Sequence, residues 1–192
     1  EGLLAALRGG ANFRDFVHIG QLLQSYLQED ADTVALREKQ SIQSGYSDLD
    51  MLLGGLKRSD LIIVGARPSV GKSSFALGIA RNAAINQGCK VAFFSLEMSS
   101  EQLAIRMLSG ESNVDNTRLR LGQQSELEER RIIQATGVLS EASIWFDDSP
   151  VLTAAELRAK SRRLAGKVGG LDLIIIDYLQ LMQGESSTGR EN

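Results

Sequence analysis

A Gly-Lys-Ser triplet at residues 71–73 is the part of the sequence with the clearest chemistry. It follows a run of branched apolar residues, Leu61-Ile-Ile-Val64, and a short loop, and a helix-compatible segment comes after it. In this order, backbone N–H groups at the loop and at the helix start face an anion, and the helix dipole adds favourable charge. Gly71 lets the backbone approach a phosphate, Lys72 can meet the β- and γ-phosphates, and the Ser73 hydroxyl can bind Mg²⁺. The pattern predicts a nucleotide-binding phosphate loop.

The predicted phosphate loop begins at Ala66, which stands where the first Gly of such loops usually stands. A plain turn between a strand and a helix is the alternative. The phosphate loop is favoured because strand, loop and helix all occur where the mechanism requires them. The loop residues expected to bind the nucleotide are Ala66, Arg67, Pro68, Ser69, Val70, Gly71, Lys72, Ser73 and Ser74.

Two acids stand at the ends of other predicted strands, where ligands of open parallel sheets bind. Asp177 ends an apolar run, residues 173–176, and its carboxylate is expected to support the Mg²⁺ shell together with Ser73. Glu97 follows the second strand and can polarise an attacking water, which is a weak nucleophile without a proton acceptor. The alternatives are an ordinary turn Asp and a Glu favoured by the helix dipole. We predict Lys72, Glu97 and Asp177 as catalytic residues.

Other charged residues have simpler explanations. Asp147 and Asp148 end a predicted strand and are expected to be turn or cap residues. Arg106 is expected to form a salt bridge, with an approach to Glu97 or a phosphate as the alternative. One helical segment is strongly basic, and a solvated face is the favoured explanation over a contact with a subunit or nucleic acid. It contains Arg158, Lys160, Arg162, Arg163 and Lys167.

Strands and helices alternate around these residues. Besides 61–64, strands are expected at 89–95, 143–147 and 171–177, and the helix after the phosphate loop is expected to run to about Asn86. Three later helices begin with the pattern of a capping box, in which two side chains satisfy free N–H groups. These pairs are Ser99 with Gln102, Ser125 with Glu128, and Thr153 with Glu156. Gly110 is expected to end the first of these helices. The alternation predicts an α/β fold with right-handed crossovers and a mainly parallel sheet.

Residues 1–40 are expected to form a linker, distinct from the domain at 41–192. Apolar residues recur at mainly helical spacing over residues 16–28, which predicts an amphipathic helix; they are Val17, Ile19, Leu22, Leu23, Tyr26 and Leu27. A lone helix cannot bury its apolar stripe, so this one packs on its own domain or on another chain. A second short helix, capped by Ser47 and ended by Gly54, is expected to lead into the first core strand.

Composition places the chain among ordinary globular proteins. Its 192 residues fit one domain with a short extension, and 43% hydrophobic and 23% charged residues are typical values. The net charge of −3 argues against a strongly basic nucleic-acid coat but leaves room for a local basic groove. Cys89 is the only cysteine, which is consistent with the cytosol. No apolar run approaches the roughly 20 residues of a membrane span, so no membrane contact is expected.

Taken together, several motifs resemble the C-terminal motor domain of bacterial DnaB-type replicative DNA helicases, which has a RecA-like P-loop fold. They are Gly45–Asp50 with Gly54–Leu56, Gly65–Ser73, Ser95–Ser99 with Gln102, Leu103, Arg106 and Met107, Asp147–Pro150, and Ile176–Met182. The resemblance covers residues 14–192. Residues 14–40 are similar to the linker helix of the family, which docks on the neighbouring subunit.

The resemblance implies a ring-shaped hexamer that hydrolyses ATP or another NTP with Mg²⁺ and moves along single-stranded DNA to unwind a duplex. It implies primase or a loader as partners, and a place in the bacterial cytoplasm at the nucleoid. Tyr178 and Gln180 would lie beside the nucleotide, and Gln180 would couple its state to the DNA-facing loops. The arginine finger of the family would follow residue 192, so this chain alone is expected to be weakly active. The alternatives are a RecA-like recombination or repair ATPase without unwinding, and a nucleotide-dependent interaction module.

Overall fold

The computed structural model describes residues 16–28, 41–67 and 69–183. The chain divides into two units, Glu1–Lys39 and Gln40–Asn192. In the first unit, α2 (Ile19–Leu27) forms inside the predicted range 16–28, and its Ile19, Leu23 and Leu27 side chains are exposed. Pro68, the side chains of Leu22 and Tyr26 and the tail at 184–192 lie outside the described residues. Among the residues that are described, no helix is long and apolar enough to cross a membrane.

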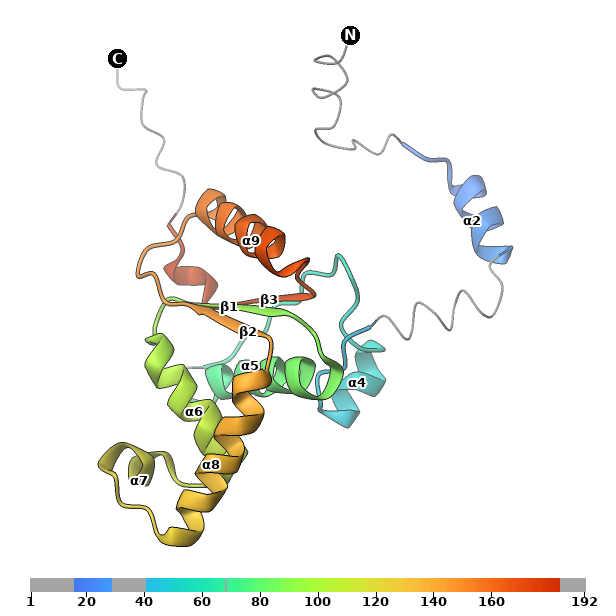
Figure 1. Ribbon diagram of the computed structural model, residues 1–192. Helices are drawn as coiled ribbons and strands as arrows, with labels where there is room; N and C mark the ends of the chain where they lie inside the picture. The colour runs from blue at the N-terminus through green and yellow to red at the C-terminus, as the bar shows by residue number, and fades with distance from the viewer. Residues whose placement is uncertain (1–15, 29–40, 68, 184–192) are drawn as a thin grey trace, which may run out of the picture. The chain divides into compact units, whose positions relative to one another are not determined.

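A parallel sheet of three strands, ordered β2-β1-β3, lies at the centre of the second unit (Figure 1). The strands are β1 (Val91–Ser95), β2 (Ile144–Asp147) and β3 (Leu173–Asp177). Val91 pairs with Ile144 on one side and with Leu173 on the other. Every residue of β1 is buried because the strand has neighbours on both edges and helices on both faces. The prediction of a parallel α/β fold is confirmed.

Alternate residues of β1 point into two separate cores. Phe93 packs with residues of α5 (Lys72–Arg81) and α6 (Ser100–Ser112) on one face of the sheet. Phe94 packs with Leu152 and with partly buried residues of α9 (Ala154–Val168) on the other face. In Figure 1, α9 accordingly lies on the opposite side of the sheet from α5, α6 and α8 (Glu126–Glu141). This burial on both faces fixes the strand ends from which the site is built.

The helix boundaries follow the predicted capping patterns closely. All three capping boxes are present, at Ser99, Ser125 and Thr153, and they open α6, α8 and α9. The helix after the phosphate loop also reaches its predicted end, because α5 continues as a π-helical turn, η1 (Asn82–Asn86). These starts were predictable because a capping box is a contact between residues three positions apart.

The predicted strand at 61–64 is wrong. Residues 61–67 form neither helix nor strand, and the side chains of Leu61 and Ile63 are 88% and 75% exposed. A strand is stabilised by ladder hydrogen bonds and by burial more than by its intrinsic propensity. The segment obtains neither here, so its branched apolar composition alone does not make it a strand.

Two predicted helix ends also need correction. Gly110 lies inside α6, which continues to Ser112 and is ended by Asn113 in the left-handed conformation (φ 51°). Ser47 is the first residue of α4 (Ser47–Leu53) and not its cap, since Tyr46 occupies that position without a side-chain bond. The predicted end of α4 at Gly54 is confirmed by its φ of 67°.

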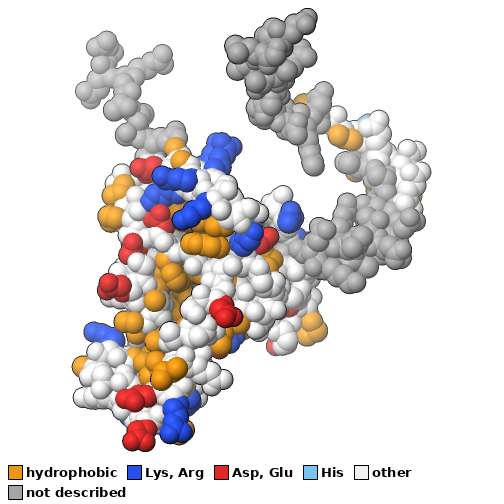
Figure 2. Space-filling model, in the orientation of Figure 1, with side chains coloured by type: hydrophobic (Ala, Val, Ile, Leu, Met, Phe, Trp, Pro, Cys, Tyr) orange, Lys and Arg blue, Asp and Glu red, His pale blue; other side chains and the backbone are white. Residues whose placement is uncertain are grey.

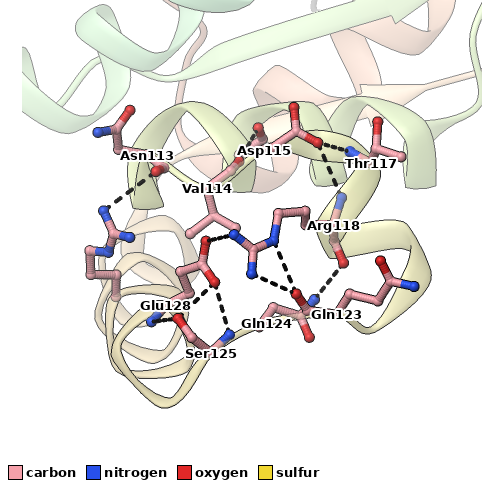
Figure 3. Close-up of polar contacts among 11 residues, drawn as sticks. Asn113, Val114, Asp115, Thr117, Arg118, Gln123, Gln124, Ser125 and Glu128 are labelled. Atoms are coloured by element: carbon pink, nitrogen blue, oxygen red, sulfur yellow. Dashed lines mark hydrogen bonds and ion pairs between the residues drawn. The ribbon is translucent and has the colours of Figure 1, made fainter.

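One helix, α7 (Asn116–Leu121), has no counterpart among the predicted elements. Figure 3 shows how it is held: Asp115 accepts hydrogen bonds from the backbone of Thr117 (2.8 Å) and Arg118 (3.2 Å). Arg118 then reaches across to α8, where it forms an ion pair with Glu128 at 2.8 Å, and donates to the carbonyl of Gln123. A helix of six residues needs such tertiary contacts, because short helices are marginal by themselves.

Candidate functional site

The N-terminus of α5 presents open backbone donors. Gly71 is the cap residue with φ 99°, a conformation that L side chains rarely adopt, and it offers no side-chain hydrogen bond. The first bond of the helix runs from Phe75 N to Gly71 O at 2.9 Å. The N–H groups of Lys72, Ser73 and Ser74 therefore have no acceptor among the described residues. Such a helix end favours an anion through its free donors and its dipole.

Lys72 and Asp177 meet at this helix end. The Lys72 Nζ lies 3.2 Å from the Asp177 Oδ1 and 3.8 Å from the centroid of the Tyr178 ring. The fold brings them together because α5 begins at Lys72 and packs beside β3, whose last residue is Asp177. The two predicted residues, 105 positions apart in the sequence, thus share one site, and the Tyr178 ring faces the ammonium as in a cation–π contact.

Asp177 is a buried residue, and one of its two carboxylate oxygens has no partner among the described residues. The residue is 2% exposed, and its Oδ2 has no hydrogen-bond partner among the described residues. A buried polar atom without a partner is costly, and such atoms concentrate where a ligand or ion supplies the missing contact. The arrangement fits the predicted role beside Mg²⁺, because a water on a bound ion would supply the donor that Oδ2 lacks.

Glu97 lies in the turn between β1 and α6. The turn starts beside Asp177, since Leu96 N donates to the Asp177 carbonyl at 2.8 Å and Ser95 pairs with Asp177 in the sheet. The Glu97 side chain is exposed, and in the described part of the chain it forms no hydrogen bond or ion pair. Its carboxylate is therefore free to meet a water molecule, and its location is set by the backbone of the turn.

The remaining predicted site residues lie in the loop before α5, in α5 itself and just beyond β3. Ser73 is half-buried in the first turn of α5, while Arg67, Ser69 and Val70 are exposed in the loop before it, where Ser69 has a positive φ of 65°. Gln180 is exposed in η2 (Leu179–Leu181), three residues beyond Asp177. No hydrogen bond or ion pair joins Gln180 to Lys72 or Glu97 in the described structure. Pro68 lies outside the described residues.

A cavity of about 560 Å³ opens beside α5. Ser74 and Gly78 of α5 line it together with Arg106 and Asn116. The salt bridge predicted for Arg106 is not found among the described residues, where Arg81 instead pairs with Glu111. Neither Lys72 nor Asp177 lines this cavity, whereas Ser74, one of the residues predicted to bind the nucleotide, does.

The basic helix predicted around Arg158 is α9, and its cations lie on the surface. Figure 2 shows Lys and Arg side chains gathered over the region where α9 lies in Figure 1. Lys160 is the exception, because it pairs with Asp147 at 2.7 Å and donates to the Ser149 hydroxyl. Within the described structure the other four cations, Arg158, Arg162, Arg163 and Lys167, form no ion pair. These contacts agree with the favoured explanation of a solvated face.

Sequence reasoning missed the contacts that hold the Glu97 turn. The Ser95 hydroxyl donates to the Met98 carbonyl at 2.7 Å and accepts from Met98 N at 3.2 Å. Asp148 was expected to be a turn or cap residue of its own segment, but its carboxylate accepts a hydrogen bond from the backbone N of Ser100 in α6, 48 residues earlier in the chain, where Ser99 is the cap. The hydroxyl at the end of β1 was a weak signal. No sequence signal indicated the Asp148 contact, because the sequence of neither segment shows which distant segment it will meet in the fold.

Taken with the fold, this site defines the class of protein. A helix N-terminus with free N–H groups, its Lys, and a strand-end Asp at the carboxyl edge of a parallel sheet are the parts of a RecA-like, P-loop nucleotide-binding domain.

Comparison with known proteins identifies the family. The family model described as the DnaB-like helicase C terminal domain matches residues 41–192. The replicative DNA helicase DnaB of Geobacillus stearothermophilus is 48% identical over 151 residues, which are 79% of this chain and 33% of that protein. The replicative DNA helicase DnaC of Bacillus subtilis (strain 168) matches with the same identity and coverage. The chain spans about a third of the length of these two relatives. It belongs to the DnaB-like helicase C terminal domain family, as its motifs predicted.

Solved structures agree with this assignment. A solved structure of an ATPase domain matches with a TM-score of 0.78 at 26% identity, over 92% of this chain and 62% of that one. The structure of a DnaB-like replicative helicase and its interactions with primase matches with a TM-score of 0.80, over 97% of this chain and 45% of that one. At 23% identity the second match supports the fold alone. The predicted RecA-like fold is confirmed.

Proposed function

We propose that this chain is the ATP-hydrolysing motor domain of a replicative DNA helicase, which in its complete form moves along single-stranded DNA and unwinds the duplex. The observation that carries the proposal is the meeting of Lys72 and Asp177 at 3.2 Å, beside the free N–H groups of α5. A structural ion pair alone does not require a helix start without a cap or a buried carboxylate oxygen without a donor. A bound phosphate and its metal ion explain both features.

The residues at the site fit Mg²⁺ together with a nucleoside triphosphate. Mg²⁺ is usually held by one or two protein oxygens, with waters and substrate phosphates completing its shell. Ser73 and Asp177 supply such oxygens, and the described residues contain no cluster of three or more His, Cys, Asp or Glu that would favour another metal. When bound, the ion neutralises charge on the phosphates. Residues 66–74 would hold the phosphates, chiefly through backbone N–H groups.

Each catalytic side chain then has a separate task. Lys72 turns from Asp177 toward the β- and γ-phosphates and offsets the charge that develops during transfer. Glu97 accepts a proton from the attacking water, for which its exposed and unpaired carboxylate is suited. Asp177 keeps its place at the end of β3, from which its carboxylate would help to hold a bound Mg²⁺ through water. Gln180, just beyond it, would report the state of the nucleotide to the DNA-facing part of the complete protein.

We infer the partners from the family and from α2. One of the matching helicases is described with its interactions with primase, and we propose primase or a loader as a partner of the complete protein here. The exposed Ile19, Leu23 and Leu27 of α2 recur every four residues, and such a stripe needs a partner surface. We propose that residues 1–40 form a linker whose helix docks on a neighbouring subunit of a hexameric ring. The replication role would place the protein in the bacterial cytoplasm, at the nucleoid.

Strand displacement by the full-length protein tests the proposal. The wild type should hydrolyse ATP faster with single-stranded DNA and should displace a paired strand, whereas Lys72→Ala should do neither. Hydrolysis stimulated by DNA without any displacement would contradict the helicase and favour a recombination or repair ATPase. Nucleotide binding without turnover would instead favour an interaction module.

A further inference from the structure

The placement of Glu97 raises a physical question, because its side chain has no anchor of its own within the described structure. A general base must lie within hydrogen-bond reach of the water that it activates. A misplacement of about 1 Å can reduce the rate of a positioned reaction about a hundredfold. Whatever holds the backbone from Leu96 to Ser100 therefore controls where the carboxylate lies.

Besides the capping box formed by Ser99 and Gln102, three contacts hold that turn, and they come from different directions. Leu96 N donates to the carbonyl of Asp177 on β3, at 2.8 Å. Ser95, which is 1% exposed, closes the turn from inside through its hydroxyl and the backbone of Met98. The third contact comes from the other edge of the sheet, where Asp148 follows the end of β2.

The Asp148 contact is a double one. Its Oδ2 accepts a hydrogen bond from Ser100 N at 2.8 Å and another from the Ser100 hydroxyl, also at 2.8 Å. Ser100 is the first residue of α6, so the carboxylate also lies where the helix dipole favours negative charge. The backbone bond from Ser100 is the main reason why the pKa of Asp148 lies below its usual value. Asp148 is therefore ionised at neutral pH, and its bonds to Ser100 are charge-assisted.

The neighbouring acid shows that this contact is selective. Asp147 accepts hydrogen bonds from Lys160 at 2.7 and 2.9 Å and from Ser149 N at 3.1 Å. Its contacts are therefore with α9 and with the turn that follows β2. Adjacent carboxylates at the end of β2 thus act on helices on opposite faces of the sheet. Of these two acids, Asp148 is the one bonded to α6, the element that follows Glu97 in the chain.

We propose that Asp148 is a positioning residue for Glu97, which it holds in place by fixing the start of α6 from the β2 edge of the sheet. The inference rests on the proposed hydrolytic function of Glu97. With the Asp177 contact on one side and the Asp148 contact on the other, the turn is clamped between both strands that flank β1. Without the Asp148 contact, the Glu97 carboxylate would still be present but would be held less accurately.

Four variants of the full-length protein separate this role from general stability. Asp148→Ala removes the acceptor, Asp148→Asn keeps an acceptor without the charge, and Ser100→Ala removes the hydroxyl donor but keeps the N–H. Asp147→Asn is the matched control, since it changes an adjacent charge without touching α6. For each variant we would measure kcat, the affinity for a fluorescent ATP analogue with Mg²⁺, and amide hydrogen exchange over residues 96–103.

We expect Asp148→Ala to lower kcat about ten- to a hundredfold, with nucleotide affinity unchanged and faster exchange over residues 96–103. Asp148→Asn should recover most of kcat, Ser100→Ala should lose a few-fold, and Asp147→Asn should match the wild type. If Asp148→Ala does not fold, Asp148→Asn and Ser100→Ala decide: wild-type exchange and kcat in both would overturn the proposal. So would an unchanged kcat in Asp148→Ala, or an equal loss in Asp147→Asn.

A Glu97→Gln variant distinguishes the proposed hydrolytic role of Glu97 from the proposed positioning role of Asp148. If Glu97→Gln turns over ATP like the wild type, the hydrolytic role of Glu97 fails, and the role of Asp148 fails with it. If Glu97→Gln is inactive while Asp148→Ala is fully active, the proposed function stands and only the positioning role of Asp148 is lost.

Discussion

Replacing Lys72 by Ala should destabilise the fold as well as abolish activity. The Asp177 side chain is 3% exposed and relies on Lys72 for its ion pair, whereas the Lys72 side chain is 26% exposed. Removing one partner of a buried pair costs about 3–5 kcal/mol, because it leaves a buried charge uncompensated. Partial exposure on the lysine side lets water screen the pair, so we reduce the expected cost to about 2 kcal/mol.

The opposite replacement, Asp177→Asn, should cost far less. It removes the buried negative charge together with its desolvation penalty, and the partly exposed Lys72 remains in contact with water. Replacing a buried ion by a neutral group of similar shape is often close to neutral, here within about 1 kcal/mol. In the double variant the orphaned charge no longer exists, so its stability should lie within about 0.5 kcal/mol of Asp177→Asn alone.

Thermal and urea unfolding of this chain can measure the cycle. Trp145 is the only tryptophan, and it lies in β2 opposite Ala92 of the central strand, so its fluorescence reports on the sheet. For a chain of this size, a loss of about 2 kcal/mol lowers Tm by about 4–8 °C. The coupling energy between the two positions should therefore be about 2 kcal/mol. Additive effects of the two single variants would refute the ion pair as a contributor to stability.

Three further predictions concern other parts of the structure. Glu97→Gln should lower kcat about 10²- to 10⁴-fold while Tm stays unchanged, since the side chain is exposed; a loss of stability instead would indicate a structural role. Gly110→Ala should stabilise α6 by about 0.5–1 kcal/mol in urea unfolding, because a Cβ there meets no atom within 4 Å. Gly122→Ala, at φ 67°, should lower the free energy of unfolding by about 1 kcal/mol. If instead Gly110→Ala destabilised the protein and Gly122→Ala did not, α6 would end at Gly110. The backbone and hydroxyl of Ser125 hold the pKa of Glu128 below its usual value of 4.5; its stabilising effect is therefore present above that pH and lost as the pH falls through the lower, folded value. Unfolding midpoints measured above and below pH 4.5 should show a flatter acid limb in Glu128→Gln, and an unaltered limb would contradict the contact.

The features predicted correctly from the sequence depend on short-range contacts or on burial from both sides. Ser99 and Gln102 are three positions apart, so their capping box can be recognised without the rest of the fold. The strand at Val91–Ser95 was recognisable because a central parallel strand is apolar at successive positions. Lys72 and Asp177 were proposed as site residues from their type and order, whereas their separation of 3.2 Å is a property of the folded chain alone.

The failures depend on competition between local preference and tertiary packing. Gly110 was expected to end α6, yet continuing a helix past Gly costs only about 1 kcal/mol. Met107 and Ser112, on either side of it, are both buried, and this packing carries the helix on to Asn113. The segment at 61–64 shows the reverse case, in which strong strand composition is not matched by pairing or burial. In both places the local sequence favoured one conformation, and tertiary packing determined whether the chain adopted it.

The helix starts show how far the sequence can separate structure from function. The same need, to satisfy the first N–H groups of a helix, arises at α5, α6, α8 and α9. In three of them a Ser or Thr cap and a Glu or Gln in the first turn meet that need within the chain. In α5 the cap is Gly71, which has no side chain to offer, and the donors of the first turn stay free. A capping box thus indicates a helix completed by its own residues, whereas the Gly-Lys-Ser start indicates a helix completed by a ligand. Of these four helices, only the one without a side-chain cap begins at the pair formed by Lys72 and Asp177.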